Sequence, residues 1–249
     1  MNNNNKIKQI FSFIILSLFA ISLPITIYIL KTGNLDIRIN AFESEEPVRV
    51  MVTDKSSDSF KVLWITEKKV FGAIKINETG EVISENFEAN SHYLELTNLE
   101  PNKAYTITIF SGTTEFPQDQ VIETLSYSEA GVNNYYVYGQ VFDKTGVKVQ
   151  QIGLVTLLAM DGYNTSELVG STLNETGGFQ INIDKLIQSV TGNKFNYDRN
   201  IDITLTIYTG IADEPIVKNY TFNFINQRQI PNIYLGDINL DIIPGVEGN

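Results

Sequence analysis

The sequence predicts an all-β protein with two β-sandwich modules in tandem behind a single N-terminal transmembrane helix. Three observations support this prediction: an uncharged apolar run near the start, period-two alternation after residue 46, and turn clusters that recur between the alternating stretches. A chain of 249 residues is long enough for two modules of ordinary size. It contains no Cys, so disulfides and thiolate chemistry are excluded and stability must come from packing.

The segment Ile10–Leu30 carries no charge, and 14 of its 21 residues are Ile, Leu or Phe. As a helix it would be about 31 Å long, which matches a bilayer core of about 30 Å. Lys6 and Lys8 precede this segment, so the positive-inside rule places the amino terminus in the cytoplasm and everything after Lys31 outside. We therefore expect a single-pass anchor in the cytoplasmic membrane and domains at the cell surface.

The alternative for this segment is a cleaved signal peptide. Apolar regions of signal peptides are usually shorter, about 7 to 15 residues, and end at a small-x-small cleavage site. No such site follows Leu30 closely, and residues 39–41 are a weak candidate for late cleavage. An uncleaved anchor is favoured, and the fate of the segment stays open at this point.

Charge separates classes of partner. The formal net charge is −11, and the part from Lys31 onward has 16 basic against 29 acidic residues, about −13. Nucleic-acid binding requires clustered Lys and Arg that neutralise phosphates, and the sequence has no such cluster. Nucleic acid is therefore excluded as a partner, while a protein or glycan ligand remains open.

The first module begins with alternating Val48, Val50 and Val52, and a second strand follows with Phe60, Val62 and Trp64 on one face. Separate strands are expected around four further groups of apolar residues: Ile74 and Ile76; Leu94 and Leu96; Tyr105, Ile107 and Ile109; and Val121 with Ile122. A turn over Asn77–Gly80 ends the third strand. The spacing of these strands and turns is typical of a sandwich.

The segment Leu99-Glu100-Pro101-Asn102-Lys103-Ala104-Tyr105 leads into one of these strands. A Tyr at this place can turn its hydroxyl back to the upstream backbone while Leu99 closes the bottom of the core, which is the tyrosine corner. With Trp64 about 40 residues earlier, and Gly72 opening the third strand, the module resembles a fibronectin type III domain over about 80 residues. The resemblance implies an immunoglobulin-like sandwich in which Trp64, Leu99, Pro101 and Tyr105 are structural.

The second module shows strands over 137–142, 154–160, 201–208, 216–224 and 233–240, and a short helix capped by Asp184 is expected over 184–190. Its opening follows the pattern G-x-V-x-D-x-x-G, with an apolar strand and a Gly-Phe hairpin behind it. About 50 residues resemble the carboxypeptidase regulatory-like (transthyretin-like) sandwich, on the residues Gly139, Val141, Asp143, Gly146, Gly178 and Phe179. This resemblance implies a second immunoglobulin-like module and supplies no activity.

The predicted boundaries are a cytoplasmic tail over 1–9, the anchor over 10–30, a spacer over 31–45, the fibronectin-like sandwich over 46–125, a linker over 126–134, the second sandwich over 135–243 and a tail over 244–249. The linker is small, polar and contains Gly, so a hinge between the modules is expected. The organisation resembles bacterial surface proteins described by their fibronectin type III domains.

Candidate chemistry is sparse. The single His92 next to Ser91 is expected to be a solvated strand-edge residue, because the sequence places no nucleophile motif around it and one His without Cys cannot form an ordinary zinc site. The oxygen-rich segment Asp161–Glu167 is expected to be a turn, and a surface Ca²⁺ there remains possible. We predict no catalytic residue, cofactor or metal.

Three tyrosines, Tyr135, Tyr136 and Tyr138, cluster at the entrance of the second module and are expected to pack at the seam between the modules. An exposed arrangement would instead suit a sugar ring.

The predicted function is a non-enzymatic, membrane-anchored surface protein whose sandwiches act as spacer and interaction modules. The alternatives are a carbohydrate or cell-wall binding module and an accessory subunit of an envelope assembly. Sequons occur at four sites: Asn77, Asn164, Asn174 and Asn219.

Overall fold

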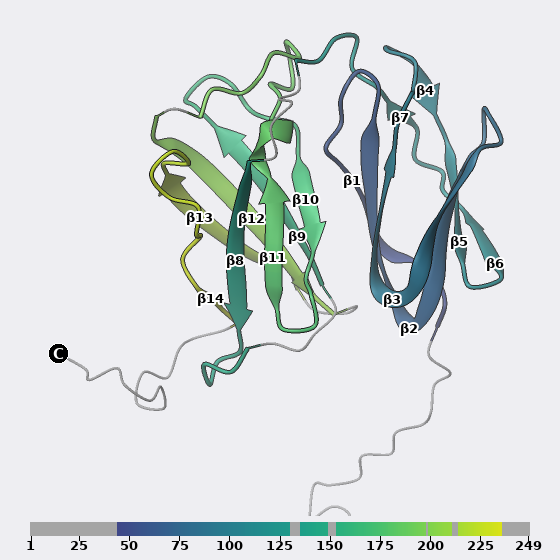
Figure 1. Cartoon of the computed structure of the whole chain (residues 1–249), viewed down its shortest axis with the longest axis horizontal. Helices are drawn as coiled ribbons and strands as arrows, with labels where there is room; N and C mark the ends of the chain where they lie inside the picture. The colour runs from purple at the N-terminus through teal and green to yellow at the C-terminus, as the bar shows by residue number, and fades with distance from the viewer. Residues whose placement is uncertain (1–43, 130–134, 149–152, 198, 211–213, 236–249) are drawn as a thin grey trace, which may run out of the picture. The chain divides into compact units, whose positions relative to one another are not determined.

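Fourteen β-strands and one short 3₁₀ helix make up the described part of the chain, which is the all-β class predicted (Figure 1). The computed structural model describes residues 44–129, 135–148, 153–197, 199–210 and 214–235, all within one compact unit, Glu43–Asn249. The predicted anchor over 10–30, its flanking segments over 1–9 and 31–43, and the tail over 244–249 lie outside the described residues. Among the described residues, no helix is long and apolar enough to span a membrane.

The first sandwich contains strands β1 to β7. Their bounds are β1 Val48–Thr53, β2 Phe60–Ile76, β3 Val82–Leu96, β4 Ala104–Tyr105, β5 Ile107–Ser111, β6 Thr114–Pro117 and β7 Ile122–Glu123. One sheet follows the order β1-β2-β5-β6 with β3 also paired to β2, and β4 pairs with β7. Every pairing in these sheets is antiparallel.

The prediction of two separate strands within β2 was wrong, and the strand predicted around Leu94 and Leu96 is only the end of β3. The structure has a continuous 17-residue β2 and a 15-residue β3, because pairing continues past two irregularities in register. The first half of β2 pairs with β1 and its second half with β5, so β2 contributes to both faces of the core. Phe60, Val62 and Trp64 from the first half share that core with Ile74 and Ile76 from the second.

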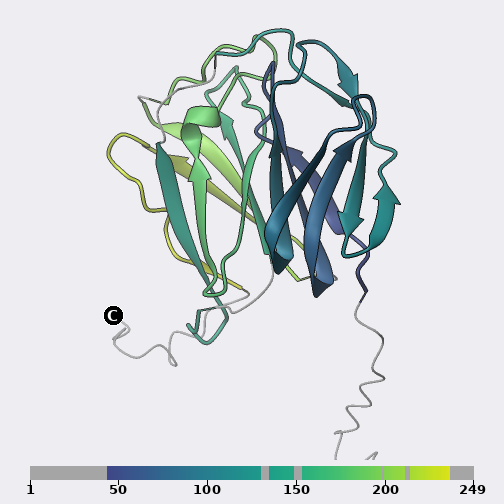
Figure 2. The ribbon, with the colours of Figure 1, turned by 45° about the vertical axis from the view of Figure 1, so that its right-hand side comes forward.

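The second sandwich contains strands β8 to β14. Their bounds are β8 Tyr136–Phe142, β9 Gly153–Met160, β10 Val169–Thr172, β11 Gly178–Asn182, β12 Ile201–Thr209, β13 Ile216–Phe222 and β14 Ile233–Tyr234. Two sheets, β10-β9-β12-β13 and β11-β8-β14, enclose an apolar core that draws on all seven strands. Figure 2 shows these strands beside those of the first sandwich after a turn of 45°.

One detail of the second sandwich differs from prediction. The expected helix over 184–190 is a single 3₁₀ turn, Ile183–Lys185, and its cap is Asn182, whose side chain accepts a hydrogen bond from the Asp184 amide. Asp184 itself is buried. Strand β14 is described only over Ile233–Tyr234, since residues 236–240 lie outside the described part of the chain.

Candidate functional site

The tyrosine corner has the geometry that its motif requires. The Glu100 amide donates a hydrogen bond to the Tyr105 hydroxyl oxygen at 2.8 Å, and the Tyr105 ring is buried at the entry to the strand. Leu99 belongs to the same core as Trp64. Pro101 is exposed in the turn between Leu99 and Tyr105. These four residues brace the first sandwich, and none of them presents a functional group to a ligand.

The glycine pattern of the second module serves its turns and its core. Asp143 Oδ1 accepts hydrogen bonds from the Thr145 amide, the Thr145 hydroxyl and the Val147 amide, at 2.6–3.0 Å. Gly146 closes this turn with a φ of 79°, a left-handed value that other residues adopt at a cost. The hydrogen bond from Thr145, together with those from the two amides, holds the pKa of Asp143 below its usual range.

Gly139 and Phe179 are paired across β8 and β11, where a methyl group at position 139 would lie 2.2 Å from Phe179 Cζ. Glycine is required here because the buried Phe179 ring occupies the space of a side chain. Gly178 follows a turn whose hydrogen bonds are made by Asn174 Oδ1, which accepts from the amides of Thr176 and Gly178. The pattern therefore specifies packing and turn geometry.

The prediction that His92 is a solvated residue at a strand edge was wrong. Its side chain is fully buried, and its ring stacks on Trp64 with centroids 4.8 Å apart and planes inclined by 10°. Nδ1 lies 2.7 Å from Glu85 Oε2, and Nε2 lies 3.1 Å from Thr66 Oγ1. An acid, an imidazole and a hydroxyl thus converge, but Thr66 and His92 are both 0% exposed, so this cluster offers no reacting group to a substrate.

A contact between the two sandwiches, called the seam below, is the most extensive site that the sequence did not predict. Leu63 and Ile65 of the first sandwich and Leu154 of the second form one apolar cluster, and all three are fully buried. Val48, Met51 and Tyr208 pack around it. The side chains of Leu63 and Ile65 alternate with that of Trp64 along β2, so this half of the strand is buried on both faces.

Hydrogen bonds and one ion pair close the edge of the seam. The Asp54 carboxylate, 2% exposed, lies 3.1 Å from Lys61 Nζ and accepts a hydrogen bond from the Gly170 amide at 3.2 Å. The Asp54 amide donates to the Leu168 carbonyl at 2.7 Å. A methyl group at Gly170 would lie 2.7 Å from Leu63 Cδ1, so this glycine permits the close approach of the two sandwiches.

Further contacts lie along the same boundary. The Gly153 amide donates to Ser91 Oγ at 3.0 Å, and Lys185 Nζ pairs with Glu95 Oε1 at 3.2 Å. In the described part of the linker, the Ser57 amide donates to Ser128 Oγ at 2.9 Å and the Glu129 amide donates to the Gly192 carbonyl. Residues 126–129 of the expected hinge are therefore held to both sandwiches by hydrogen bonds. Residues 130–134 lie outside the described part of the chain.

The tyrosines at the entrance of the second module do not pack at the seam, contrary to prediction. Tyr135 packs against the core of its own sandwich, and its hydroxyl donates to the Phe224 carbonyl at 2.8 Å. Tyr138 is 47% exposed and pairs in register with Gln180, while Tyr136 pairs with Asn182. The two tyrosines thus lie on the same face of the β11-β8-β14 sheet.

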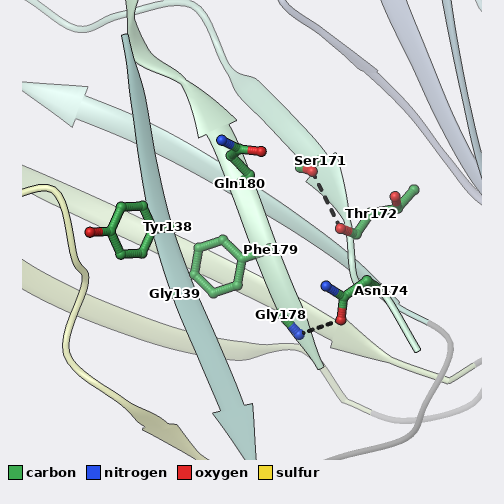
Figure 3. A pocket seen from close by; sticks show the side chains of 8 residues that line it. All are labelled: Tyr138, Gly139, Ser171, Thr172, Asn174, Gly178, Phe179 and Gln180. Atoms are coloured by element: carbon green, nitrogen blue, oxygen red, sulfur yellow. Dashed lines mark hydrogen bonds between the residues drawn. The ribbon is translucent and has the colours of Figure 1, made fainter. Parts of the chain in front are cut away.

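A shallow pocket of about 510 Å³ lies beside Tyr138 (Figure 3). Its side chains come from β8, β10, β11 and the turn before β11: Tyr138, Ser171, Thr172, Asn174, Phe179 and Gln180. These are aromatic, hydroxyl and amide groups without a formal charge. Such a lining suits a neutral, hydrogen-bonding ligand better than an ion.

The oxygen-rich segment Asp161–Glu167 forms a turn, as predicted. Asp161 Oδ1 accepts from the Asn164 amide at 3.1 Å, and Oδ2 accepts from Arg199 Nη2 at 2.9 Å. Burial alone would raise the pKa of Asp161, but the bonds from Arg199 and Asn164 outweigh it and the pKa is lowered. Within the described ranges, no three His, Cys, Asp or Glu residues are grouped to hold a metal ion.

Sequence reasoning missed Glu85, Thr66 and the seam residues, although one signal was present. The run Val62–Ile65 is apolar at four successive positions, which is typical of a strand buried on both faces. That run could have indicated a contact outside the first sandwich. Glu85 and Thr66 gave no such signal, because a strand-edge Glu and a buried one look alike in sequence.

The comparisons with known proteins add three partial structural likenesses. No protein-family model and no curated protein matches the chain. The FN1-FN3 domains of chicken CNTN1 are 13% identical over 69% of this chain and 64% of theirs, with a TM-score of 0.25. A two-domain fibronectin type III segment of chicken tenascin is 10% identical over 71% and 99%, with a TM-score of 0.23.

The central fibronectin type III array of a RIM-binding protein is 13% identical over 74% of this chain and 66% of that one, with a TM-score of 0.22. This chain thus spans just under two thirds of the CNTN1 and RIM-binding protein structures. Likenesses at this level assign no function. The architecture given above rests on the sheets and cores of the chain itself.

Proposed function

We propose that the protein is a non-enzymatic, membrane-anchored surface protein in which two sandwiches form one rigid spacer with an interaction surface at its far end. The observation that supports the spacer role is the seam. Leu63, Ile65 and Leu154 are fully buried between the sandwiches, and the Asp54 side chain beside them is 2% exposed. Tandem modules joined by an apolar contact of this kind keep a fixed orientation, whereas modules on a free linker do not.

The direction of β1 supports a display role. The Ser44 carbonyl accepts a hydrogen bond from the Lys68 amide at one end of the first sandwich, and β1 then runs to Thr53. Residue 54 contacts Leu168 at the other end. A six-residue strand is about 20 Å long. The loop that ends at Leu168 therefore lies at the end of β1 opposite Ser44, and we call this the far end.

That far end carries exposed apolar side chains on loops. Tyr163 is fully exposed, Val190 is 93% exposed and Tyr127 is 54% exposed. The Ser189 amide donates to the Thr165 carbonyl, so the loops of Tyr163 and Val190 run beside each other. Loops held on a rigid scaffold are common binding elements, and this pair is our candidate for the contact with a protein partner.

The placement is tested by protease treatment of intact cells that produce the protein, followed by mass spectrometry of the released peptides. We expect peptides from residue 46 onward to be released from intact cells, and the segment over 10–30 to remain with the membrane fraction. Release of these peptides only after lysis would contradict a surface location. A mature protein whose first residue follows residue 41 would show that the segment over 10–30 belongs to a cleaved signal peptide and is not an anchor.

A second candidate function, binding of a neutral saccharide, is favoured by the pocket beside Tyr138. An exposed Tyr138 ring next to the Gln180 amide and the Thr172 hydroxyl offers a stacking face and hydrogen-bonding groups. A panel of neutral oligosaccharides, titrated against the full-length chain and its Tyr138→Ala variant, distinguishes the two functions. Binding that is lost in Tyr138→Ala but kept in Tyr163→Ala would favour the saccharide, and silence across the panel would remove it.

A further inference from the structure

The buried cluster around His92 lies where the two long strands bend. Thr66 lies inside the first irregularity in the register of β2, between Ile65 and Val70, and Gly72 lies inside the second, between Phe71 and Ala73. On β3, His92 pairs with Trp64, and Glu85 lies in the second irregularity, where its carboxylate accepts from the Gly72 amide. The cluster therefore joins the half of each strand that pairs near β1 to the half that pairs near β5.

The positions of the hydrogen atoms at Nε2 follow from counting donors. Thr66 Oγ1 lies 2.8 Å from the Lys68 carbonyl oxygen and 3.1 Å from His92 Nε2. A carbonyl oxygen cannot donate, and a Thr hydroxyl has one hydrogen, so that hydrogen is given to Lys68. Thr66 Oγ1 is then an acceptor toward the ring, and His92 Nε2 must carry a proton.

The hydrogen atom at His92 Nδ1 follows from the hydrogen bonds that Glu85 accepts. Glu85 Oε2 accepts from the Gly72 amide and Oε1 from the Tyr93 amide, both at 3.2 Å, and the Glu85 side chain is 3% exposed. Two backbone donors favour the ionised carboxylate over the acid. A carboxylate 2.7 Å from Nδ1 needs a donor there, so His92 Nδ1 also carries a proton.

The indole of Trp64 completes the site. It stacks nearly parallel to the imidazole ring, at 4.8 Å between centroids. A cation over the face of an indole is attracted by the electron density of the ring, and the attraction grows when water is absent. A methyl group at Gly72 would lie within 2.8 Å of Trp64, Glu85 and His92 atoms, so the packing leaves no room for a water molecule at that position.

We infer that His92 is an imidazolium that donates to Thr66 and Glu85 at once, and that this ion pair is a proton-dependent latch at the bend of β2 and β3. Among the described residues, Glu85 is the charged group in contact with the ring. Glu67 and Lys68 in the adjacent irregularity instead bind the Ser44 amide and Glu45. Removing the proton from His92, or adding one to Glu85, leaves a buried charge without its partner.

The chain contains a single His, so nuclear magnetic resonance of the full-length protein labelled with ¹⁵N-histidine reports this residue alone. At neutral pH we expect both ring nitrogens to show bonded protons that exchange slowly with water. One protonated and one bare ring nitrogen would overturn the inference. This measurement needs no substitution and is decisive even if the variants below do not fold.

The variant Glu85→Gln removes the anion and keeps the shape of the side chain. We expect His92 to become neutral in it, with one ring N–H signal, while the matched control Glu88→Gln, exposed on the same strand, keeps both. The difference in unfolding midpoint between wild type and Glu85→Gln should shrink toward both acid and base. A difference that stays constant with pH would contradict a proton-dependent latch.

Discussion

Glu85 in the first sandwich and Asp184 in the second are both buried carboxylates, and they are held in different ways. Glu85 in the first sandwich accepts two backbone amides and faces a fully buried His92. Asp184 in the second is 1% exposed and accepts from Tyr197 Oη at 2.7 Å, Lys194 Nζ at 3.1 Å and the Tyr135 amide at 3.1 Å. His92, the partner of Glu85, is enclosed by the core, whereas the side chain of Lys194, a partner of Asp184, is 36% exposed.

This difference teaches that a buried charge can be stabilised in two ways. The positive charge that faces Glu85 depends on a proton of the buried His92 ring, so loss of that proton removes the ion pair. Burial would lower the pKa of Lys194, but its hydrogen bonds to Asp184 and Tyr197, together with the charges of these two groups, outweigh burial and raise the pKa. Burial and the bond to Asp184 also raise the pKa of Tyr197. The second pair thus stays intact until alkaline pH.

The largest expected effect comes from filling the glycine position in each core. Gly72→Ala places a methyl group 2.6 Å from Trp64 Cζ2, and Gly139→Ala places one 2.2 Å from Phe179 Cζ. We expect each to lower the free energy of unfolding by about 3 kcal/mol, since rigid rings must move. Chemical denaturation measures this, with exposed Ser84→Ala as a neutral control. A loss below about 1 kcal/mol would show that the cores repack easily.

Removing the second carboxylate should have the next largest effect. Asp184→Ala leaves Tyr197 Oη and the Tyr135 amide without their acceptor, and we expect a loss of about 2 kcal/mol in unfolding free energy. The cost is limited because Lys194 can turn its amine to water. The matched control is Asp202→Ala, whose exposed carboxylate accepts from Thr221. Equal effects of the two substitutions would contradict the role given to burial.

A smaller effect separates two copies of one tetrapeptide. Asn-Glu-Thr-Gly occurs at 77–80 and at 174–177. Asn174 Oδ1 accepts three hydrogen bonds within its own turn, whereas the Asn77 side chain bonds to Thr106, between β4 and β5, and to Thr108 in β5. We expect Asn174→Ala to cost about 1 kcal/mol and Asn77→Ala about half as much. Thermal unfolding of the two variants compares them directly, and the reverse order would be evidence against this account.

The smallest expected effect concerns alkaline pH. Since the pKa values of Lys194 and Tyr197 are raised by folding, their contribution is complete below their unfolded values of about 10 and is lost as pH rises through the folded ones. The second sandwich should therefore weaken above about pH 10. Amide exchange in β8 and β11 measures this. In Asp184→Ala the alkaline loss should be smaller, and an unchanged loss would rule out this cluster as its source.

The sequence predicted the all-β class, the paired strands and the Asp161 turn because these depend on alternation and turn chemistry within a few residues. It could not predict that β2 continues through Thr66–Lys69, since polar residues at a bend resemble those of a loop. Exposure of His92 was predicted wrongly for a related reason: its partner Glu85 is seven residues away and is brought close only by the bend. The two copies of Asn-Glu-Thr-Gly teach the same lesson, because the strands around them select the turn.

Seam contacts were beyond local reasoning as well. Lys61 and Asp54 are ordinary surface residues in sequence, and burial at the seam depends on Gly170, more than 100 residues later. Only the apolar run at Val62–Ile65 indicated that both faces of β2 are covered. Contacts between modules are set by the shape of two folded surfaces, which alternation along one strand does not encode.

The proposal of one rigid spacer is tested most directly by the distance between the sandwiches. Because the chain has no Cys, spin labels can be attached at Glu115→Cys in β6 and Val217→Cys in β13, both exposed. Pulsed electron resonance on the full-length chain should give a single narrow distance distribution, and Gly170→Val should broaden it by forcing the seam apart. A broad distribution in the chain with an intact Gly170 would contradict the rigid spacer.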